Sequence, residues 1–462
     1  MSVLDQIDTI VFMMLENRSF DHMLGHLSLP PFADGTDVDG LKAPLNNPAY
    51  ENVDASGQSY YPFQLRDGTL STDVPHERDF VAAQLSKSNV SGQYTMSGFV
   101  RAYYQFQTTN RTLNPDPMGF LTPVDVPITN FLAKNYCVCD RWFSSLPAST
   151  QPNRLMSLTG DSLIDYTTGL FPKRGDLHLD WLTRHGIPWR VYHCGISFFA
   201  LLGYLGIFGE NFRNIDNLAS DVMDMSKEFP KVIVVEPSFG DAPHIGNDVP
   251  NDNHPPLAVA PGEAFLRQVY EALTANPKRW ARTLMVLTYD EHGGFFDHVP
   301  PLPIPYSPPA GQATYPRFES LGIRVPSLII SPLVAPQSVF HGLLDHTSML
   351  QLLAEKFAPQ EVGYSASVNQ RRDAGINSVS RALNLTTPRT DIPDPPPAPS
   401  RGLVSFSGPD VNASPMQHAF QSAAQYMNQK YPNETADKYP EIRHWALMQD
   451  LTRLPELPEK TA

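Results

Sequence analysis

The sequence predicts an α/β fold in which helices cover both faces of a mostly parallel sheet. Four apolar runs are too short for typical helices and are typical of strands buried on both faces. They span residues 7–15, 231–235, 282–289 and 325–330. An amphipathic helix is predicted between the second and third runs, over residues 262–275. Strands that alternate with helices in this way favour a doubly wound sheet.

Length and composition indicate one large folded domain with an elaborated C-terminal part. Of the 462 residues, 41% are apolar and only 18% are charged, which is typical of a folded chain. The 45 prolines predict long loops around a regular core. We expect a main domain over 1–382, a proline-rich linker over 383–402, and a helical arm over 403–462 that packs on the main domain. Within the arm, helices are predicted at 415–431 and 439–451.

Charge and hydropathy disfavour nucleic acid, anionic lipid and a membrane-spanning segment. The net charge is −14 without a basic stripe, so no nucleic acid is expected, and anionic lipid is disfavoured. No apolar stretch reaches membrane-spanning length. The first eight residues show no export signal, so a cytoplasmic location and export by another route both stay open. Three cysteines, Cys137, Cys139 and Cys194, are interpreted as small buried side chains rather than a disulfide framework.

Acidic and amide side chains directly follow two of the predicted strands. Glu16 and Asn17 end the first strand, and Asp290 and Glu291 end the third. Ligands of doubly wound sheets bind beyond the carboxyl ends of the strands, so these side chains are expected in one crevice. Their oxygens suit Mg²⁺, Ca²⁺ or Mn²⁺ and are acceptable to Zn²⁺. The first pair alone has a simpler interpretation as a strand end and a helix cap.

The segment after the third strand concentrates ionisable groups between residues that bury it. Five such groups fall within nine residues: Asp290, Glu291, His292, Asp297 and His298. Gly-Gly and Phe-Phe pairs stand among them, and the glycines permit close backbone approach to a ligand. Buried carboxylates require a cation or a partner. The pattern therefore predicts a metal site rather than a solvated loop.

A hydroxyl group is predicted beside this crevice. The segment 146–154 leads into a helix-like run at 155–159, and Pro152 suits the first turn of that helix. Thr150 would lie at the helix N-terminus, where the dipole favours an anionic phosphoryl group and a metal lowers the hydroxyl pKa. Taken alone, Thr150 is interpreted as a helix cap.

Other histidines stand in settings that suit acid–base chemistry. His76 follows Asp73-Val-Pro, His254 follows Asn-Asp-Asn, and His346 precedes a helical run at 348–357. Such groups protonate a leaving alkoxide and neutralise phosphate charge. A lone histidine of this kind is more often structural.

Together these segments resemble the bacterial phosphoesterase family that contains phosphatidylcholine-hydrolysing phospholipases C and acid phosphatases. The resemblance covers residues 7 to 357 and follows the family's order of motifs. Those motifs are ENRSFDH at 16–22, PxxTxPNR at 147–154, NDNHPP at 251–256, YDEHGGFFDHVPP at 289–301 and DHTS at 345–348. The first and fourth motifs are highly specific as a pair.

The resemblance implies an alkaline-phosphatase-like fold and one or more divalent metal ions, drawn from Ca, Zn, Mg and Mn. It implies a nucleophile at Thr150 and metal ligation by Glu16, Asn17, Thr150, Asp290 and Glu291. It implies phosphate binding or leaving-group protonation by His76, His254, His298 and His346. Four residues are expected in the phosphate pocket or around it: Asp252, Asp297, His292 and Asn153.

The expected function is a metal-dependent phosphoesterase with a threonine nucleophile. Phospholipase C action on phosphocholine-like headgroups is the leading substrate hypothesis, and the alternative is an acid phosphatase for small soluble monoesters. A non-catalytic, metal-stabilised binding protein is the alternative from another class. A sulfatase is disfavoured, because the motif that begins at Thr150 would need Cys or Ser at that position.

Overall fold

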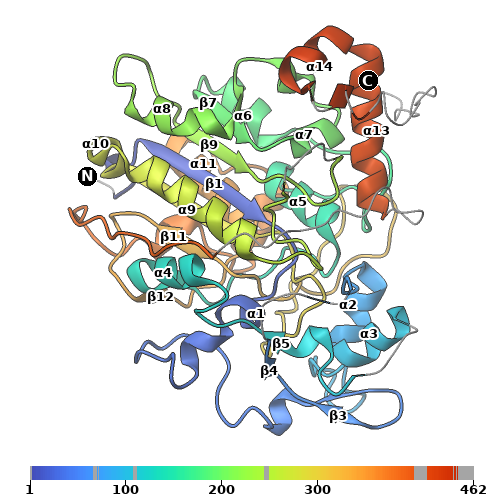
Figure 1. The fold of residues 1–462 in the computed structure, drawn as a ribbon. Helices are drawn as coiled ribbons and strands as arrows, with labels where there is room; N and C mark the ends of the chain where they lie inside the picture. The colour runs from blue at the N-terminus through green and yellow to red at the C-terminus, as the bar shows by residue number, and fades with distance from the viewer. Residues whose placement is uncertain are drawn as a thin grey trace.

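The fold is built on an eight-stranded central sheet (Figure 1). The computed structural model describes residues 3–65, 70, 72–107, 112–243, 249–399, 414–440, 442–443 and 445. In spatial order the strands are β12 (Ser338–Phe340), β6 (Cys137–Cys139), β11 (Leu328–Ile330), β10 (Thr283–Tyr289), β1 (Thr9–Leu15), β9 (Val232–Glu236), β7 (Trp189–His193) and β8 (Phe212–Asn214).

The sheet is mostly parallel, as predicted. Only β11 runs against its neighbours, pairing antiparallel with β10 and β6. The central strand β1 pairs in parallel with β10 on one side and β9 on the other. All four predicted strands are present. The other four strands were not among those runs. Of these, β6 is only three residues long, and β7, β8 and β12 are short and mix polar with apolar residues.

Helices cover both faces of the sheet, which confirms the doubly wound α/β prediction. One face carries α4 (Pro127–Asn135), α8 (Leu218–Met223) and α9 (Ala260–Thr274), in front of the sheet in Figure 1. The opposite face carries α5 (Thr150–Thr159) and α11 (Thr347–Phe357), which contact each other. The prediction of a helix over 262–275 is confirmed by α9, whose buried Phe265, Leu266, Val269 and Leu273 form the expected apolar stripe.

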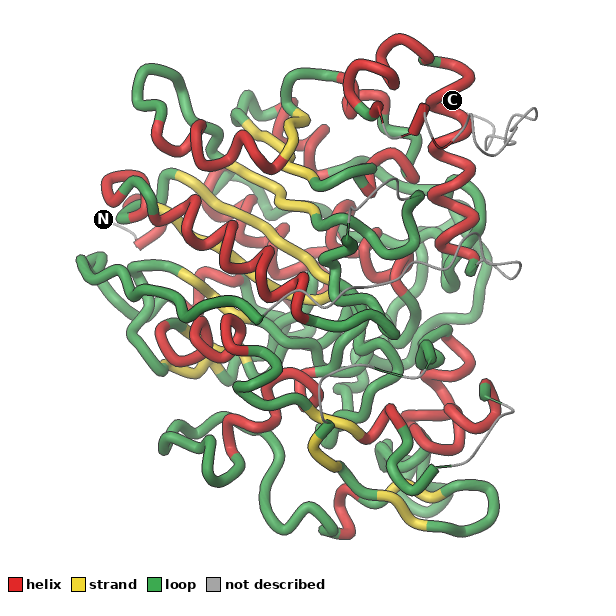
Figure 2. The backbone as a smooth tube through the Cα atoms, viewed as in Figure 1, coloured by secondary structure: helices red, strands yellow, loops and turns green. Residues whose placement is uncertain are grey.

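Long loops surround this core, as the proline content predicts (Figure 2). A second, smaller hydrophobic core lies beyond the strand ends, between α2 (Arg78–Leu85), α3 (Phe99–Phe106) and short strands. Those strands are β2 (Asn52–Val53), β3 (Ser59–Tyr60), β4 (Phe63–Gln64) and β5 (Gly119–Phe120). The other α-helices are α1 (Phe20–Leu24), α6 (His178–Arg184), α7 (Phe198–Leu201), α10 (Pro277–Trp280), α12 (Ala366–Asp373), α13 (Pro415–Lys430) and α14 (Pro432–Lys438). Short 3₁₀ helices lie at Val3–Gln6, Gly25–Ser28, Pro48–Tyr50, Asp116–Met118, Leu205–Phe208, Ile215–Asn217 and Val379–Ala382.

The C-terminal part contacts the rest of the chain at several points. In the predicted linker, Leu385 N donates to Leu333 O at 3.1 Å, and Pro393 O accepts from the Tyr270 hydroxyl at 2.8 Å. The prediction of a helix at 415–431 is confirmed by α13, which contacts α7. The helix predicted at 439–451 lies mostly outside the described residues, and the division into domain, linker and arm stays a prediction. Among the described residues, no helix has both the length and the hydropathy to span a bilayer.

Candidate active site

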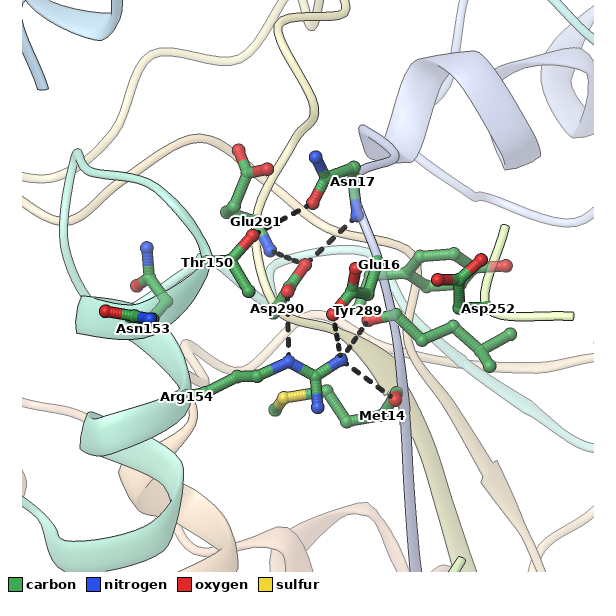
Figure 3. Close-up of polar contacts among 12 residues, drawn as sticks. Met14, Glu16, Asn17, Thr150, Asn153, Arg154, Asp252, Tyr289, Asp290 and Glu291 are labelled. Atoms are coloured by element: carbon green, nitrogen blue, oxygen red, sulfur yellow. Dashed lines mark hydrogen bonds and ion pairs between the residues drawn. The ribbon is translucent and has the colours of Figure 1, made fainter. Parts of the chain in front are cut away.

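The parallel register of β1 and β10 brings the two predicted ligand pairs together. Leu15 lies opposite Tyr289, so the following residues Glu16 and Asp290 stand at neighbouring strand ends. Asp290 Oδ1 accepts from Asn17 N at 3.0 Å and from Glu291 N at 2.7 Å (Figure 3). The four side chains of the two strand-end pairs are each at most 1% exposed. The site is therefore a buried group of carboxylate and amide oxygens at the carboxyl edge of the sheet.

Tight backbone turns bring three chain segments of the site into contact: those at Asn17, at Pro75 and at Gly293-Gly294. Asn17 has a positive φ of 59°, a left-handed conformation that asparagine tolerates better than most residues. Gly293 also has a positive φ, and a Cβ there would overlap the carbonyl of Asn17. A Cβ at Gly294 would overlap the carbonyl of Pro75, next to His76. The glycine pair thus permits close approach between segments of the chain, and the predicted approach to a ligand stays a prediction.

Thr150 lies at the first residue of α5, with its hydroxyl directed at the carboxylate group. Its Oγ1 donates to Asn17 Oδ1 at 3.3 Å, and the residue is 3% exposed. The N-cap position belongs to Ser149, so Thr150 is not the cap that the simpler interpretation expected. Ser149 Oγ instead donates to Glu77 Oε2 at 2.7 Å. The helix thus starts five residues before the predicted run and carries Thr150 into the crevice.

Asn153 supports the loop before α5 instead of facing this crevice. Its Nδ2 donates to the carbonyls of Leu146 at 3.1 Å and Ala148 at 2.8 Å. Figure 3 shows Asn153 on the far side of α5 from Asp290. Asn153 therefore shapes the turn that presents Thr150.

Arg154, which was absent from the predicted site, supplies a cation to it. Its Nη2 lies 3.1 Å from Glu16 Oε1, and its Nε lies 3.2 Å from Asp290 Oδ2. A signal existed in the sequence, because Arg154 lies four residues after Thr150 and helical residues at that spacing share a face. The guanidinium neutralises part of the charge of two buried carboxylates.

The electrostatics of the carboxylates favour a further cation. Burial raises the pKa of Glu16 well above its usual value, although Arg154 opposes the effect. Burial likewise raises the pKa of Asp290 to about 6 against the influence of Arg154. In Glu291 the effect of burial is outweighed by His76 and His292, which lower the pKa. Among the described residues, Glu291 Oε1 is a buried oxygen that accepts no hydrogen bond, and Glu16 Oε1 has the ion pair with Arg154 but no hydrogen bond. The donor set therefore fits a hard divalent cation.

Two of the predicted histidines lie against Asn17. Asn17 Nδ2 is 3.0 Å from His254 Nε2 and 3.3 Å from His76 Nε2. Burial lowers the pKa of His254, but the surrounding carboxylates raise it to about 10; they belong to Asp241, Asp73, Glu16 and Asp252. His76 has a raised pKa because Glu291 and Asp73 outweigh its burial. Both imidazoles thus lie beside the Asn17 amide, with pKa values that the surrounding carboxylates raise.

Asp252 and Asp241 hold His254 from two sides. Asp252 O accepts from Glu16 N at 2.9 Å, and its Oδ1 accepts from His254 N at 3.1 Å. Asp241 Oδ2 lies 3.7 Å from His254 Nε2, and ligand atoms of Glu16, Asp241 and His254 lie within 4.8 Å of one another. Asp241 was not predicted, because it stands in a loop without a periodic pattern or a motif that points to it.

His292 orients a predicted ligand and does not face Thr150. Its Nδ1 lies 3.1 Å from Glu291 Oε2, and its Nε2 lies 2.8 Å from Gln84 Oε1. Gly293 N donates to the same Glu291 oxygen at 2.9 Å. These contacts leave Glu291 Oε1 as the oxygen that is free to bind a ligand.

Asp297 and His298 belong to a separate ionic network around Arg324. Arg324 Nε donates to Asp297 Oδ1 at 2.9 Å, and its Nη2 donates to Asp21 Oδ1 at 3.2 Å. His298 Nδ1 lies 2.7 Å from Asp21 Oδ2, and its Nε2 lies 3.4 Å from Asp39 Oδ1. The structure therefore joins Asp297 and His298 to Arg324 and not to Thr150.

His346 is enclosed, with both ring nitrogens in hydrogen bonds. Its Nε2 donates to Asp290 O at 2.6 Å, and its Nδ1 accepts from Trp142 Nε1 at 3.3 Å. Burial lowers the pKa of His346 to about 4, so the ring is neutral. These contacts fix the backbone of Asp290.

Comparison with known proteins identifies the class. Residues 7–358 match the Phosphoesterase family. Non-specific phospholipase C3 of Arabidopsis thaliana is 31% identical over 416 residues, which cover 84% of this chain and 75% of that protein. Phospholipase C B of Mycobacterium tuberculosis is 30% identical over 447 residues, which cover 89% and 82%.

Solved structures with partial similarity have low sequence identity. A protein in the alkaline phosphatase superfamily from Vibrio parahaemolyticus is 12% identical, with a TM-score of 0.32 over 50% of this chain and 60% of that one. The lipoteichoic acid synthase LtaP from Listeria monocytogenes is also 12% identical, with a TM-score of 0.34 over 53% and 69%.

The family match and the relatives identify a hydrolase that acts on phosphoester bonds. The chain belongs to the Phosphoesterase family, and the resemblance drawn from its motifs is confirmed.

Proposed function

We propose that this hydrolase uses Thr150 as its nucleophile, depends on a divalent metal, and cleaves phosphodiesters of the phospholipase C type. The contact that carries the proposal is the 3.3 Å hydrogen bond from Thr150 Oγ1 to Asn17 Oδ1, inside a buried carboxylate group. The names of the relatives, which are phospholipases C, support the choice of a diester substrate.

The metal would be held by the predicted set, Glu16, Asn17, Thr150, Asp290 and Glu291. Bound there, a Ca, Zn, Mg or Mn ion would neutralise the carboxylates and lower the pKa of the Thr150 hydroxyl. Asn17 orients this set from its backbone and from its side chain, since its N–H bonds Asp290 and its Oδ1 bonds Thr150. Arg154 holds Glu16 and Asp290 in place through its two ion pairs.

The residues support a two-step displacement. The Thr150 hydroxyl loses its proton to solvent, and its oxygen attacks phosphorus while the bond to the leaving alcohol breaks. His254, which is 3.0 Å from the Asn17 amide, gives a proton to the departing oxygen, and His76 stabilises charge on the phosphoryl group. Neutral His254 then takes a proton from a water molecule, whose oxygen bonds to phosphorus as the bond to the Thr150 oxygen breaks. The Thr150 oxygen regains a proton from solvent, which restores the hydroxyl.

His346 and His298 take supporting roles in this proposal, although the sequence predicted them as acids. His346 uses both ring nitrogens and has a pKa of about 4, so it orients Asp290 rather than donating a proton. His298 is bound by Asp21 and Asp39 and stabilises the loop that follows the metal site.

Substitution of Thr150 tests the proposal. Thr150→Ala should lower kcat for p-nitrophenyl phosphorylcholine by at least about a thousandfold, whereas Thr150→Ser should retain measurable turnover. Ser149→Ala is the matched control and should stay active. Near-normal turnover by Thr150→Ala would refute the nucleophile. The substrate class is tested separately with wild-type protein.

A comparison of p-nitrophenyl phosphate with p-nitrophenyl phosphorylcholine tests the substrate. A higher kcat/KM for the choline diester supports phospholipase C action, and a higher value for the monoester assigns acid phosphatase action. Hydrolysis of neither ester in the presence of Ca, Zn, Mg and Mn would favour the non-catalytic binding protein.

A further inference from the structure

The start of helix α13 reaches the active site from the C-terminal end of the chain. Ser414 Oγ donates to Asp241 Oδ1 at 3.0 Å. The other oxygen of Asp241 faces His254 Nε2 at 3.7 Å, and Glu16 completes the same group. A residue more than 170 positions from Asp241 thus contacts the carboxylate that borders His254.

The geometry of the helix cap fixes the direction in which Ser414 donates. Ser414 Oγ accepts from Gln417 N at 3.0 Å, and Gln417 Oε1 accepts from Ser414 N at 2.8 Å, forming a capping box. A serine hydroxyl has one hydrogen and two acceptor lone pairs. Because the helix N–H takes a lone pair, the hydrogen is available for Asp241. The Ser414 hydroxyl therefore caps helix α13 and donates a hydrogen bond to the Asp241 carboxylate at the same time.

Helix α13 is held firmly against the segments that carry the site. Phe420 is fully buried and packs at a tilt against Phe239, two residues before Asp241, with ring centroids 5.3 Å apart. Met416 Sδ lies 3.9 Å from Nε2 of Gln151, the residue after Thr150. Figure 1 shows α13 beside α7, which it contacts. The helix is thus positioned by packing, and Ser414 has a fixed place relative to both segments.

We propose that Ser414 is a positioning residue of the active site, which orients the Asp241 carboxylate so that Asp241 holds His254 against Asn17. Side chains that hydrogen-bond a metal-ligating residue set its orientation, and their loss typically reduces metal affinity or activity 10- to 100-fold. We expect a loss of similar size when Asp241 loses its partner. Without the Ser414 hydroxyl, Asp241 Oδ1 loses its hydrogen-bond donor and the carboxylate can rotate away from His254. The C-terminal arm therefore contributes to the site of the main domain. This inference rests on the proposed function, in which protonated His254 lies beside the phosphoryl group and gives a proton to the departing oxygen.

The test must separate the bond to Asp241 from the helix cap. Ser414→Gly removes the hydroxyl but changes helix capping by only a few tenths of a kcal/mol. Ser414→Thr keeps both the cap and the donor. Ser422→Ala is the matched control on the same helix, because Ser422 Oγ donates to Gly169 O at 3.4 Å and does not contact Asp241. Thermal unfolding of all three full-length variants confirms that they fold.

The readouts are the affinity for inorganic phosphate by calorimetry and the separate kcat and KM for p-nitrophenyl phosphorylcholine. Ser414→Gly should weaken phosphate affinity and raise KM by about tenfold, while Ser414→Thr and Ser422→Ala stay within about twofold of wild type. Wild-type-like phosphate affinity in folded Ser414→Gly would overturn the inference. So would a loss in Ser414→Thr as large as that in Ser414→Gly. If wild-type protein binds phosphate but hydrolyses neither ester, the proposed function fails, and the affinities still test Ser414.

Discussion

Arg154 and Asp290 form a buried ion pair in which Nε lies 3.2 Å from Oδ2 and neither side chain is more than 6% exposed. The same guanidinium lies 3.1 Å from Glu16. Figure 3 shows it reaching both carboxylates from the side opposite Asn17. The guanidinium of Arg154 thus provides a cation to both of these carboxylates.

Removal of Arg154 should destabilise the protein. In Arg154→Ala, Glu16 and Asp290 would be buried without their partner, and breaking a buried pair in this way costs about 3–5 kcal/mol. We expect that loss in the free energy of unfolding, measured with denaturant in the presence of a chelator. Arg154→Lys keeps the charge but not the planar fork, so an intermediate loss is expected. Equal stability of Arg154→Ala and wild type would show that the ion pair contributes nothing.

The roles of His254 and His346 should differ in their dependence on the leaving group. A general acid matters most when the leaving alcohol is a poor one, with an effect of about 10²–10⁴-fold. His254→Asn should therefore lower kcat for an alkyl phosphorylcholine at least about tenfold more than for the p-nitrophenyl ester. His346→Asn should lower both by the same factor, because it shifts Asp290. A selective loss on the alkyl ester in His346→Asn would restore His346 as the acid.

The sequence could predict the parts of the site that follow regular structure. Glu16 and Asp290 end two apolar runs, and parallel strands place such residues at one edge. Arg154 could have been found from its helical spacing to Thr150. The contact between Asp241 and Ser414 depends on how the loop of Asp241 packs against the segment before α13. The pattern of residues in the sequence does not predict that packing.

The histidines show a second limit of sequence reasoning. His254 and His346 stand in similar short polar motifs, yet one lies against Asn17 and the other is enclosed between Trp142 and the Asp290 carbonyl. Whether a ring nitrogen is free to act depends on neighbours that are distant in the sequence. The pattern of residues alone therefore predicts a group of candidate acids and not their roles.

The close approach of Gly293 to Asn17 predicts that a methyl group at position 293 disrupts the site. In Gly293→Ala, the new Cβ would overlap the Asn17 carbonyl and the positive φ of 62° would be strained. We expect a loss of activity together with lower stability. Gly311→Ala is the matched control, because Gly311 has a φ of 79° and open space around it. The control should lose about 1–2 kcal/mol of stability and remain active. Comparable activity in the two variants would contradict the prediction.

The pairing of His298 with Asp21 predicts a loss of stability at alkaline pH. Burial lowers the pKa of His298, but Asp21 and Asp39 raise it to about 10. In the unfolded chain the pKa is about 6.5, so the folded state binds the proton more tightly. The stabilisation is therefore complete below pH 6.5 and is lost as the pH rises from 6.5 to 10.

His298→Gln should remove this pH dependence, because glutamine keeps a hydrogen-bond donor but has no titrating charge. We expect the variant to be less stable than wild type at pH 6 and the difference to shrink towards pH 10, as measured by denaturant unfolding. Turnover of folded His298→Gln at pH 6 should remain within about tenfold of wild type, since the network around Arg324 does not contact Thr150. If instead the stability difference is the same at every pH and turnover is abolished, His298 is a catalytic residue, as its position in the motif predicted.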